Sequence, residues 1–407
     1  MNRHLSSTFA IVFLALSFIS AILQAEEGKW QLKELFKVPK WQKAQKDFPE
    51  KDSITPIFYE NGACRGKQTE AFAWLALPEG ASAKKKVPGI VIVHGGGGTA
   101  YRAWAALWQK RGYAAIAMDI TGGIPQDEDL NSLVCKSVPA ANGGPNLNKN
   151  FRETKLPFQD QWPVYAVDAI IRANSLLRSL PEVDDKRIGI TGISWGAMMG
   201  EVAAGLDNRF AFAAFVYGCG FMGDSSFFKE TELDKLPEAE RKFWLDNFDA
   251  SNYIGRIKCP VLFANGAKDK HFRPDSWGRS VRLLPAEQVW LSYDVAMKHS
   301  HLPYCDPPEI AAFADSWTFG KQKNPQLASQ NGNTAVFKVP NGIAKAVFCW
   351  TTENAPWPER NWQTKPAAAE GEKVSVDAIP EDATAYFFRI VDKKGLSAAS
   401  SPIVIQK

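Results

Sequence analysis

Ser194 lies between two glycines in the stretch "TGISWGAMMG", which begins at Thr191. Residues 192–196 fit the pattern G-x-S-x-G, in which a serine sits on a tight turn between a strand and a helix. The flanking glycines are needed because a Cβ at either position would clash with the neighbouring chain. The spacing makes Ser194 a candidate nucleophile, and a glycine-rich turn with an incidental serine is the alternative.

A serine hydroxyl needs a base to act as a nucleophile at neutral pH, in practice a histidine that a carboxylate orients. The chain contains five histidines, of which His299 and His301, in "AMKHSHLPYC", follow a late predicted strand and precede a predicted helix. In the chain order serine, acid, histidine, the base stands at this place. We expect His301 to be the base because it is nearer the helix at Pro307, and His299 is the alternative.

The orienting acid should follow a strand between the serine and the two histidines. Asp269 does so in "CPVLFANGAKDKHF", where a short turn after the predicted strand presents the carboxylate. Asp275 and Asp294 compete for this role, but Asp275 stands at a predicted helix start and Asp294 is only a few residues from the histidine pair. We therefore expect Asp269 to orient the base, and a plain surface turn is the alternative.

The intermediate of acyl transfer carries an oxyanion, which two backbone N–H groups must bind. We expect one N–H from Trp195, the residue after the serine. We expect the other from the stretch "VHGGGG" (93–98), with Gly96 or Gly97 as the donor, because glycine lets the backbone approach a ligand closely. The stretch lacks the G-K-[ST] and G-x-G-x-x-G patterns of phosphate-binding loops. We expect no metal and no cofactor at this site.

The elements that must position these residues follow an α/β pattern. Up to about residue 320, short apolar runs such as "GIVIV" alternate with helical stretches such as "TAYRAWAALWQKRG". Roughly seven or eight strands, several of them apolar on both faces, predict a mostly parallel sheet flanked by helices. After a polar linker at 323–333, short β-type runs without helices predict a small β-sandwich of immunoglobulin or fibronectin III type over 334–407.

The first 25 residues predict a secretory signal peptide, with Arg3 before an apolar run and Ala25 before an acidic pair. The apolar run is shorter than the roughly 20 residues of a membrane-spanning helix, and an uncleaved anchor is the alternative. The catalytic domain is then expected over 26–322, in a secreted or periplasmic protein without stable membrane insertion.

Composition narrows the classes of partner and site. A net charge of +4 without a long basic block gives no support for nucleic-acid binding. Export favours some disulfide pairing among the six cysteines, although their spacing does not identify the pairs. No CxxC pair is present, which argues against structural zinc.

Taken in order, "VHGGGG", "GISWG", the acid turn and the late histidines resemble the α/β-hydrolase superfamily over residues 65–320. Within it, "VIVHGGGGTAYRAWAALWQKRGYAAIAMDITG" and "GISWGAMMG" resemble the acetyl xylan esterase and dienelactone hydrolase branch, which is related to prolyl oligopeptidase-type serine peptidases. The resemblance implies an eight-stranded sheet and a Ser-His-Asp triad that hydrolyses carboxylic esters through an acyl-enzyme. In secreted members the esters are commonly acetyl or related groups on polysaccharides. Ala197 departs from the second glycine that many such enzymes have.

The expected function is thus that of a secreted serine esterase acting on a small ester or an esterified polysaccharide. One alternative is a prolyl oligopeptidase-type peptidase, which usually carries a propeller domain for which the N-terminal part is too short. Another is a non-catalytic binding protein of the same fold, with the C-terminal β-domain as its working part. The stretch "WTTENAPWPERNW" (350–362) suggests a sugar-stacking surface on that domain, and buried sandwich tryptophans are the alternative.

Overall fold

The computed structural model describes residues 29–44, 48, 52–126, 132–133, 136–302, 306–321 and 323–405. The predicted signal peptide lies outside these residues. Within them, no helix is both long and apolar enough to cross a membrane.

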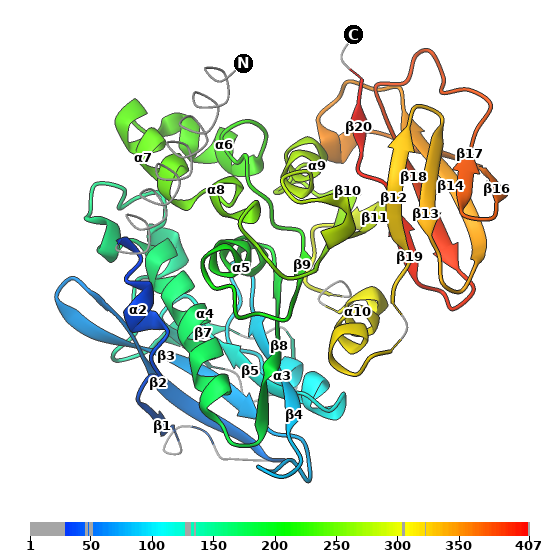
Figure 1. The fold of residues 1–407 in the computed structure, drawn as a ribbon. Coiled ribbons are helices and arrows are strands. Elements are labelled where there is room, and N and C mark those ends of the chain that lie inside the picture. The colour runs from blue at the N-terminus through cyan, green and yellow to red at the C-terminus, as the bar shows by residue number, and fades with distance from the viewer. Residues whose placement is uncertain are drawn as a thin grey trace, which may run out of the picture.

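A nine-stranded sheet in the order β1-β2-β3-β5-β4-β8-β9-β10-β11 forms the centre of the first part of the chain (Figure 1). The run from β5 to β11 is parallel, and the three strands at the other end are antiparallel. This confirms the predicted mostly parallel sheet, with the three-residue β1 as an addition to the eight strands expected. The strands are β1 (Trp41–Lys43), β2 (Ile54–Cys64), β3 (Lys67–Ala76), β4 (Val87–Val93), β5 (Ala114–Met118), β8 (Val183–Ile193), β9 (Phe212–Val216), β10 (Val261–Lys268) and β11 (Val289–Lys298).

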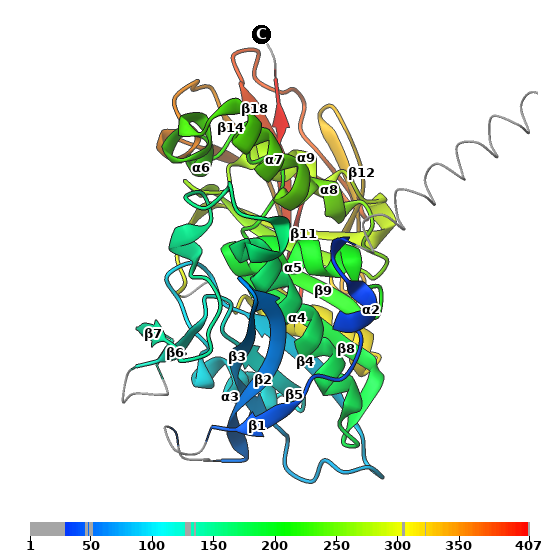
Figure 2. The same ribbon diagram turned by 90° about the vertical axis from the view of Figure 1, so that its left-hand side faces the viewer.

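Helices cover both faces of this sheet. Helices α4 and α5 contact one face, and α3 and α10 contact the other (Figure 2). Strands such as β9 are buried along their whole length because side chains on both faces meet helices. The helices are α2 (Leu32–Leu35), α3 (Arg102–Lys110), α4 (Trp162–Ser179), α5 (Trp195–Leu206), α6 (Phe227–Thr231), α7 (Glu238–Phe248), α8 (Ser251–Ile254), α9 (Pro274–Val281) and α10 (Pro308–Thr318).

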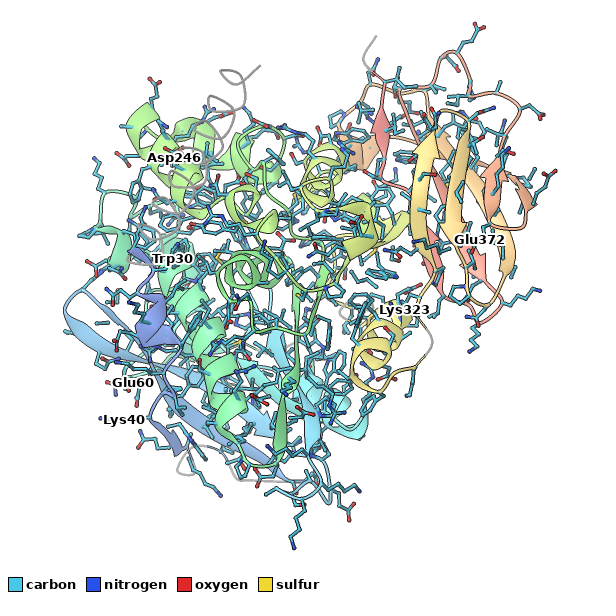
Figure 3. All side chains as sticks on the ribbon, viewed as in Figure 1. Trp30, Lys40, Glu60, Asp246, Lys323 and Glu372 are labelled. Atoms are coloured by element: carbon cyan, nitrogen blue, oxygen red, sulfur yellow. The ribbon has the colours of Figure 1, made fainter. Side chains whose placement is uncertain are left out.

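The segment between β9 and β10, which contains α6, α7 and α8, forms a helical insertion. The first described segment, which includes Trp30 (labelled in Figure 3), packs against it. Trp30 is buried, and its indole N–H donates to the Tyr253 hydroxyl of α8 at 3.2 Å. Charged side chains such as Lys40 and Asp246 lie at the periphery instead (Figure 3). A short hairpin of β6 (Gly123–Pro125) and β7 (Ser137–Pro139) lies apart from the main sheet.

Two antiparallel sheets form the C-terminal β-domain, in agreement with the predicted β-sandwich. The domain has its own apolar core, which includes Phe337, Phe348 and Phe388. One sheet contains β12 (Gln326–Asn331), β13 (Thr334–Lys338), β17 (Lys373–Ser375) and β16 (Ala368–Glu370), and the other contains β15 (Gln363–Pro366), β14 (Ile343–Thr351), β18 (Ala385–Asp392), β19 (Ser397–Ala399) and β20 (Ile403–Val404).

The predicted linker at 323–333 needs correction, because strand β12 lies within it. The residues of β12 are polar because the strand is at a sheet edge and half exposed. The buried amide of Gln326 also donates to backbone carbonyls of Ala286, Glu287 and Val289, at 3.0 to 3.2 Å. The polar residues of 326–331 therefore form an edge strand of the β-domain, and Gln326 joins this strand to the catalytic part by hydrogen bonds.

Four of the six cysteines, Cys64, Cys219, Cys259 and Cys349, are described and carry free thiols. Cys135 and Cys305 lie outside the described residues. The expected disulfide pairing therefore finds no pair among the described cysteines.

Candidate active site

Ser194 occupies the sharp turn between β8 and α5. Its φ of 58° and ψ of −123° form a strained conformation for a non-glycine residue, and its N–H donates to the Val216 carbonyl at 2.9 Å. A Cβ at Gly192 would lie 2.5 Å from the Gly196 carbonyl oxygen, and one at Gly196 would lie 2.3 Å from that of His94. Both flanking positions therefore require glycine, because a side chain at either one would overlap a backbone oxygen.

The parallel pairing of β10 with β11 brings an acid and a histidine together. Lys268 and Lys298 are register partners, so the next residues, Asp269 and His299, leave the same edge of the sheet side by side. His299 Nδ1 lies 3.0 Å from each oxygen of Asp269, and His299 Nε2 lies 2.9 Å from Ser194 Oγ. With Nδ1–H donating to the carboxylate, Nε2 is free to accept the serine proton, as in a Ser-His-Asp triad.

The prediction of His301 as the base needs correction, because the histidine between Ser194 and Asp269 is His299. The ring of His301 packs against Tyr101 and Trp104, with centroids 4.9 and 5.8 Å apart, and its Nε2 is buried without a partner among the described residues. Burial lowers the pKa of His301 to about 4, so the ring is neutral at pH 7. The alternative, His299, directly follows β11, which ends at Lys298, and it contacts both Ser194 and Asp269.

Asp269 is fully buried, and its carboxylate is fixed from two sides. Oδ1 accepts the backbone N–H groups of His271 at 2.7 Å and Phe272 at 3.1 Å, while the imidazole of His299 approaches both oxygens. This turn sets the direction of the carboxylate independently of the histidine. Asp269, the acid that the sequence predicts, therefore faces His299 in a fixed direction.

The two competing acids face other partners. Asp275 lies in the first turn of α9, where its carboxylate accepts the Ser276 N–H at 2.9 Å. Asp294 lies on β11 and pairs with Arg389 of β18 at 3.3 Å. Neither carboxylate contacts His299.

Tyr217, which is not among the predicted site residues, follows β9 and packs on the imidazole of His299. The ring centroids are 4.4 Å apart, and the Tyr217 hydroxyl lies 2.7 Å from the Lys298 carbonyl oxygen and 3.2 Å from that of Ser300. The ring of His271 lies against His299 as well, 4.3 Å away at a steep angle. The available signal for Tyr217 was its place directly after a parallel strand, at the edge that holds the triad.

The glycine loop after β4 lies close to Ser194. A Cβ at Gly95 would lie 3.1 Å from the Cβ of Ser194, and one at Gly96 would lie 2.7 Å from the indole Cδ1 of Trp195. Gly97 has a φ of 75° and no atom within 4 Å of its Cβ position, so it faces open space. Within the described residues, the amides of Gly96 and Trp195 have no protein acceptor. Of the two predicted loop donors, Gly96 is thus the one in contact with Trp195.

His94, which is not among the predicted site residues, holds this loop in place. It is buried, its Nδ1 lies 2.8 Å from the Gly95 carbonyl oxygen, and its Nε2 lies 3.1 Å from the amide nitrogen of Ile120. Because the carbonyl can only accept and the amide can only donate, the proton belongs on Nδ1. The ring thereby fixes the glycine loop to the end of β5.

An aromatic pocket of about 180 Å³ lies beside Trp195, the residue that follows Ser194. The Trp195 indole forms part of its wall and lies 4.7 Å from the ring of Phe228 in the helical insertion. The sequence predicts a role for the Trp195 amide, and it does not predict that the Trp195 side chain lines a pocket. The pocket is lined by Leu147, Asn148, Phe151, Arg152, Trp195, Phe227, Phe228 and Glu232.

Among the described residues, one group has metal-ligand geometry: Asp269, His271 and His299 offer ligand atoms within 4.8 Å of one another. Both ring nitrogens of His299 already contact partners, Asp269 on one side and Ser194 on the other. Burial, with the charge of His299 adding to it, lowers the pKa of His271 to about 4. Within this group, Asp269 contacts His299, which in turn contacts Ser194, as in a Ser-His-Asp triad.

Known proteins resemble the chain in sequence and in fold. The probable dipeptidyl-peptidase 5 of Aspergillus clavatus is 23% identical over 236 residues, which cover 54% of this chain and 29% of that peptidase. The chain thus spans less than a third of the length of this curated relative. An acetyl xylan esterase from Paenibacillus sp. R4 matches with a TM-score of 0.54 and 22% identity, over 71% of this chain and 93% of its own.

A second acetyl xylan esterase, from Thermoanaerobacterium sp. JW/SL YS485, matches with a TM-score of 0.51 and 16% identity, over 69% of this chain and 89% of its own. These structural matches confirm the α/β-hydrolase fold. The family model of acetyl xylan esterase (AXE1) matches residues 30–277, more than half of the chain, and includes Ser194 and Asp269. The protein therefore belongs to the acetyl xylan esterase family of carboxylic ester hydrolases.

Proposed function

We propose that the protein is a serine esterase that removes acetyl or related acyl groups from a carbohydrate, with Ser194, His299 and Asp269 as its triad. The observation that carries the proposal is the continuous chain of contacts from Ser194 Oγ through both nitrogens of His299 to Asp269, at 2.9 and 3.0 Å. The family supports an ester as the substrate. The strained turn at Ser194 supports the serine as the nucleophile.

The proposed reaction has two halves. In the first, His299 Nε2 takes the hydroxyl proton while Ser194 Oγ attacks the ester carbonyl, and Asp269 stabilises the imidazolium that forms. The amides of Trp195 and Gly96 donate to the oxyanion. The imidazolium then gives its proton to the departing alcohol oxygen, which leaves an acyl-serine. In the second half, His299 takes a proton from water as the water oxygen attacks the acyl carbon. The imidazolium then returns this proton to Ser194 Oγ as the bond to the acyl carbon breaks, which releases the acid and restores the serine.

The pocket beside Trp195 supports a carbohydrate as the alcohol part of the ester. Its walls present flat aromatic faces, against which the apolar face of a sugar ring packs. Its polar side chains, Asn148, Arg152 and Glu232, supply hydrogen-bond groups of both kinds for hydroxyls. Apolar walls with a few polar groups are the usual make-up of a small-molecule site.

The test is acetate release from acetylated xylan by the wild type and by Ser194→Ala, with methanol release from pectin and ferulate release from feruloyl esters as parallel arms. We expect acetate release that the substitution abolishes. Circular dichroism of the variant controls for folding. Release of none of the three products by the folded wild type would overturn the carbohydrate assignment.

A serine peptidase is the second candidate, because the curated relative is named as a peptidase. The same triad attacks an amide when the leaving group fits. Hydrolysis of a prolyl-p-nitroanilide without hydrolysis of p-nitrophenyl acetate would favour the peptidase. We expect the reverse.

We also propose that the protein is exported, because its first 25 residues have the three parts of a signal peptide. N-terminal sequencing of the protein from the medium or periplasm tests this. We expect the mature chain to begin at Glu26, and an intact N-terminus in the cytoplasm would contradict the proposal.

A further inference from the structure

The C-terminal β-domain covers the edge of the catalytic sheet that carries two members of the triad. Strand β11, which leads to His299, is the edge strand, and the β-domain lies beside it (Figure 1). Phe387 of β18 is fully buried and meets the ring of Tyr293 on β11 edge to face, with centroids 4.8 Å apart. Phe387 belongs to the core of the catalytic part, so the two parts share one apolar interior.

One polar contact of the β-domain reaches the strand of the base. The pairing of β10 with β11 is irregular between Gly266 and Lys268, where β11 contains extra residues. Asp294 shapes this irregularity, since its Oδ1 accepts the Ala296 N–H at 2.8 Å. Its Oδ2 lies 3.3 Å from Arg389 Nη2 of β18. Arg389 therefore fixes the carboxylate that shapes the final stretch of strand before His299.

A second polar contact reaches the strand of the acid. Lys268 directly precedes Asp269, and its Nζ donates to the backbone carbonyl of Arg360. The Arg360 guanidinium stacks on Trp357 at 3.7 Å, and its Nε donates to the Ala355 carbonyl at 2.7 Å. The acceptor thus belongs to an ordered loop of the β-domain.

The tryptophan in this loop is buried, with 6% of Trp357 exposed. The neighbouring Trp362 packs on Phe387, with centroids 5.3 Å apart. These contacts direct the aromatic segment toward the catalytic part. The segment therefore serves the interface between the two parts better than it would serve a sugar-stacking surface.

We propose that the C-terminal β-domain is a positioning element of the active site, in which Arg389 and the Arg360 loop hold the ends of β11 and β10 so that His299 and Asp269 meet Ser194. The inference rests on the triad of the proposed function. A displacement of a catalytic group by about 1 Å costs up to about 100-fold in rate. Loosening either contact therefore lowers kcat while the pocket, and with it KM, is preserved.

The test uses the full chain with Arg389→Met and Lys268→Met, and with Arg389→Lys and Lys268→Arg as conservative variants. Lys345→Met on β14 and Lys258→Met before β10 are matched controls, because both lysines are exposed. The readouts are kcat and KM for p-nitrophenyl acetate, and the rate at which a fluorophosphonate labels Ser194. Titration of active sites with the same probe expresses each rate per folded molecule.

We expect kcat and the labelling rate of the two methionine variants to fall about tenfold per active site, with KM changed less than about twofold. The conservative variants should recover most of the rate, and the two controls should match the wild type. Wild-type kcat and labelling per active site in both methionine variants, with only a lower unfolding temperature, would overturn the proposal. Labelling also separates the two proposals, because it reports the triad even if no carbohydrate ester is cleaved.

Discussion

The ring of Tyr217 lies on the imidazole of His299, with centroids 4.4 Å apart and planes inclined by 31°. The Tyr217 hydroxyl meets the backbone carbonyls of both neighbours of the histidine, Lys298 and Ser300. Tyr217 follows β9 and His299 follows β11, so this one side chain spans β10, the strand that carries the acid. Tyr217 thereby holds both the ring face of His299 and the backbone on either side of it.

Replacing Tyr217 with Phe should lower kcat for p-nitrophenyl acetate about tenfold, because the ring contact stays while the two carbonyls lose their partner. KM should change little. The matched control is Tyr59→Phe, which removes another buried hydroxyl, bonded to the Ala169 carbonyl at 2.9 Å, far along the sheet order from the triad. Equal effects of both substitutions on kcat would show that Tyr217 acts through stability alone.

Replacing His301 with Phe should make the protein less sensitive to acid while activity at neutral pH is kept. The folded pKa of His301 is lowered to about 4 from an ordinary 6.5, so between these values the unfolded chain binds more protons than the folded one. His301 therefore makes the wild type lose stability as the pH falls from about 6.5 to 4. The phenylalanine keeps the ring against Tyr101 and Trp104.

The measurement is the unfolding temperature of wild type and His301→Phe at several pH values from 4 to 8. We expect the variant to lose less stability than the wild type on acidification. Parallel curves would mean that His301 titrates alike in the folded and unfolded chain. His271, whose pKa is lowered in the same way, is left in place and gives both proteins a remaining acid sensitivity.

Replacing Trp195 with Ala should change the choice of substrate, because the indole forms a wall of the pocket while the amide at the start of α5 is kept. We expect the ratio of kcat/KM for acetylated xylan to that for p-nitrophenyl acetate to fall at least about tenfold, because the carbohydrate part of the ester loses this wall. Trp108→Ala, at another buried tryptophan away from the pocket lining, controls for general loosening. An unchanged ratio would remove this pocket from the substrate site.

Replacing Gly196 with Ala should prevent correct assembly of the turn at Ser194. The added Cβ would lie 2.3 Å from the His94 carbonyl oxygen and 2.4 Å from that of Val93, and neither backbone group has room to move. We expect loss of soluble protein, or of kcat/KM by more than about 100-fold in what remains. Gly332→Ala, at a positive φ but in open space, should cost only about 1–2 kcal/mol of stability and no activity. A soluble, active Gly196→Ala would contradict the tight turn.

The parts of the site that depend on local chain geometry could be predicted from the sequence. The turn at Ser194 is specified by two glycines and by the change from strand to helix, all within ten residues. Asp269 directly follows a short buried strand, β10, which ends at Lys268. Both signals are present in the residues that form the feature.

The choice between the two late histidines could not be made locally. It depends on how far β11 continues, and the extra residues in its pairing with β10 are held by Asp294 and by Arg389 of the β-domain. It also depends on Tyr101, whose ring packs against the ring of His301. Arg389 and Tyr101 are distant from the two histidines in the chain, and no periodic pattern in the sequence predicts their contacts.

The proposal that His299 is the base for Ser194 is tested most directly by comparing His299→Ala with His301→Ala. The readout is the rate at which a fluorophosphonate labels Ser194, with the labelled peptide identified by mass spectrometry. We predict that His299→Ala lowers the rate about 10⁴-fold, since the serine loses its base, whereas His301→Ala stays within about threefold of the wild type. Loss of labelling in His301→Ala with retention in His299→Ala would contradict the account.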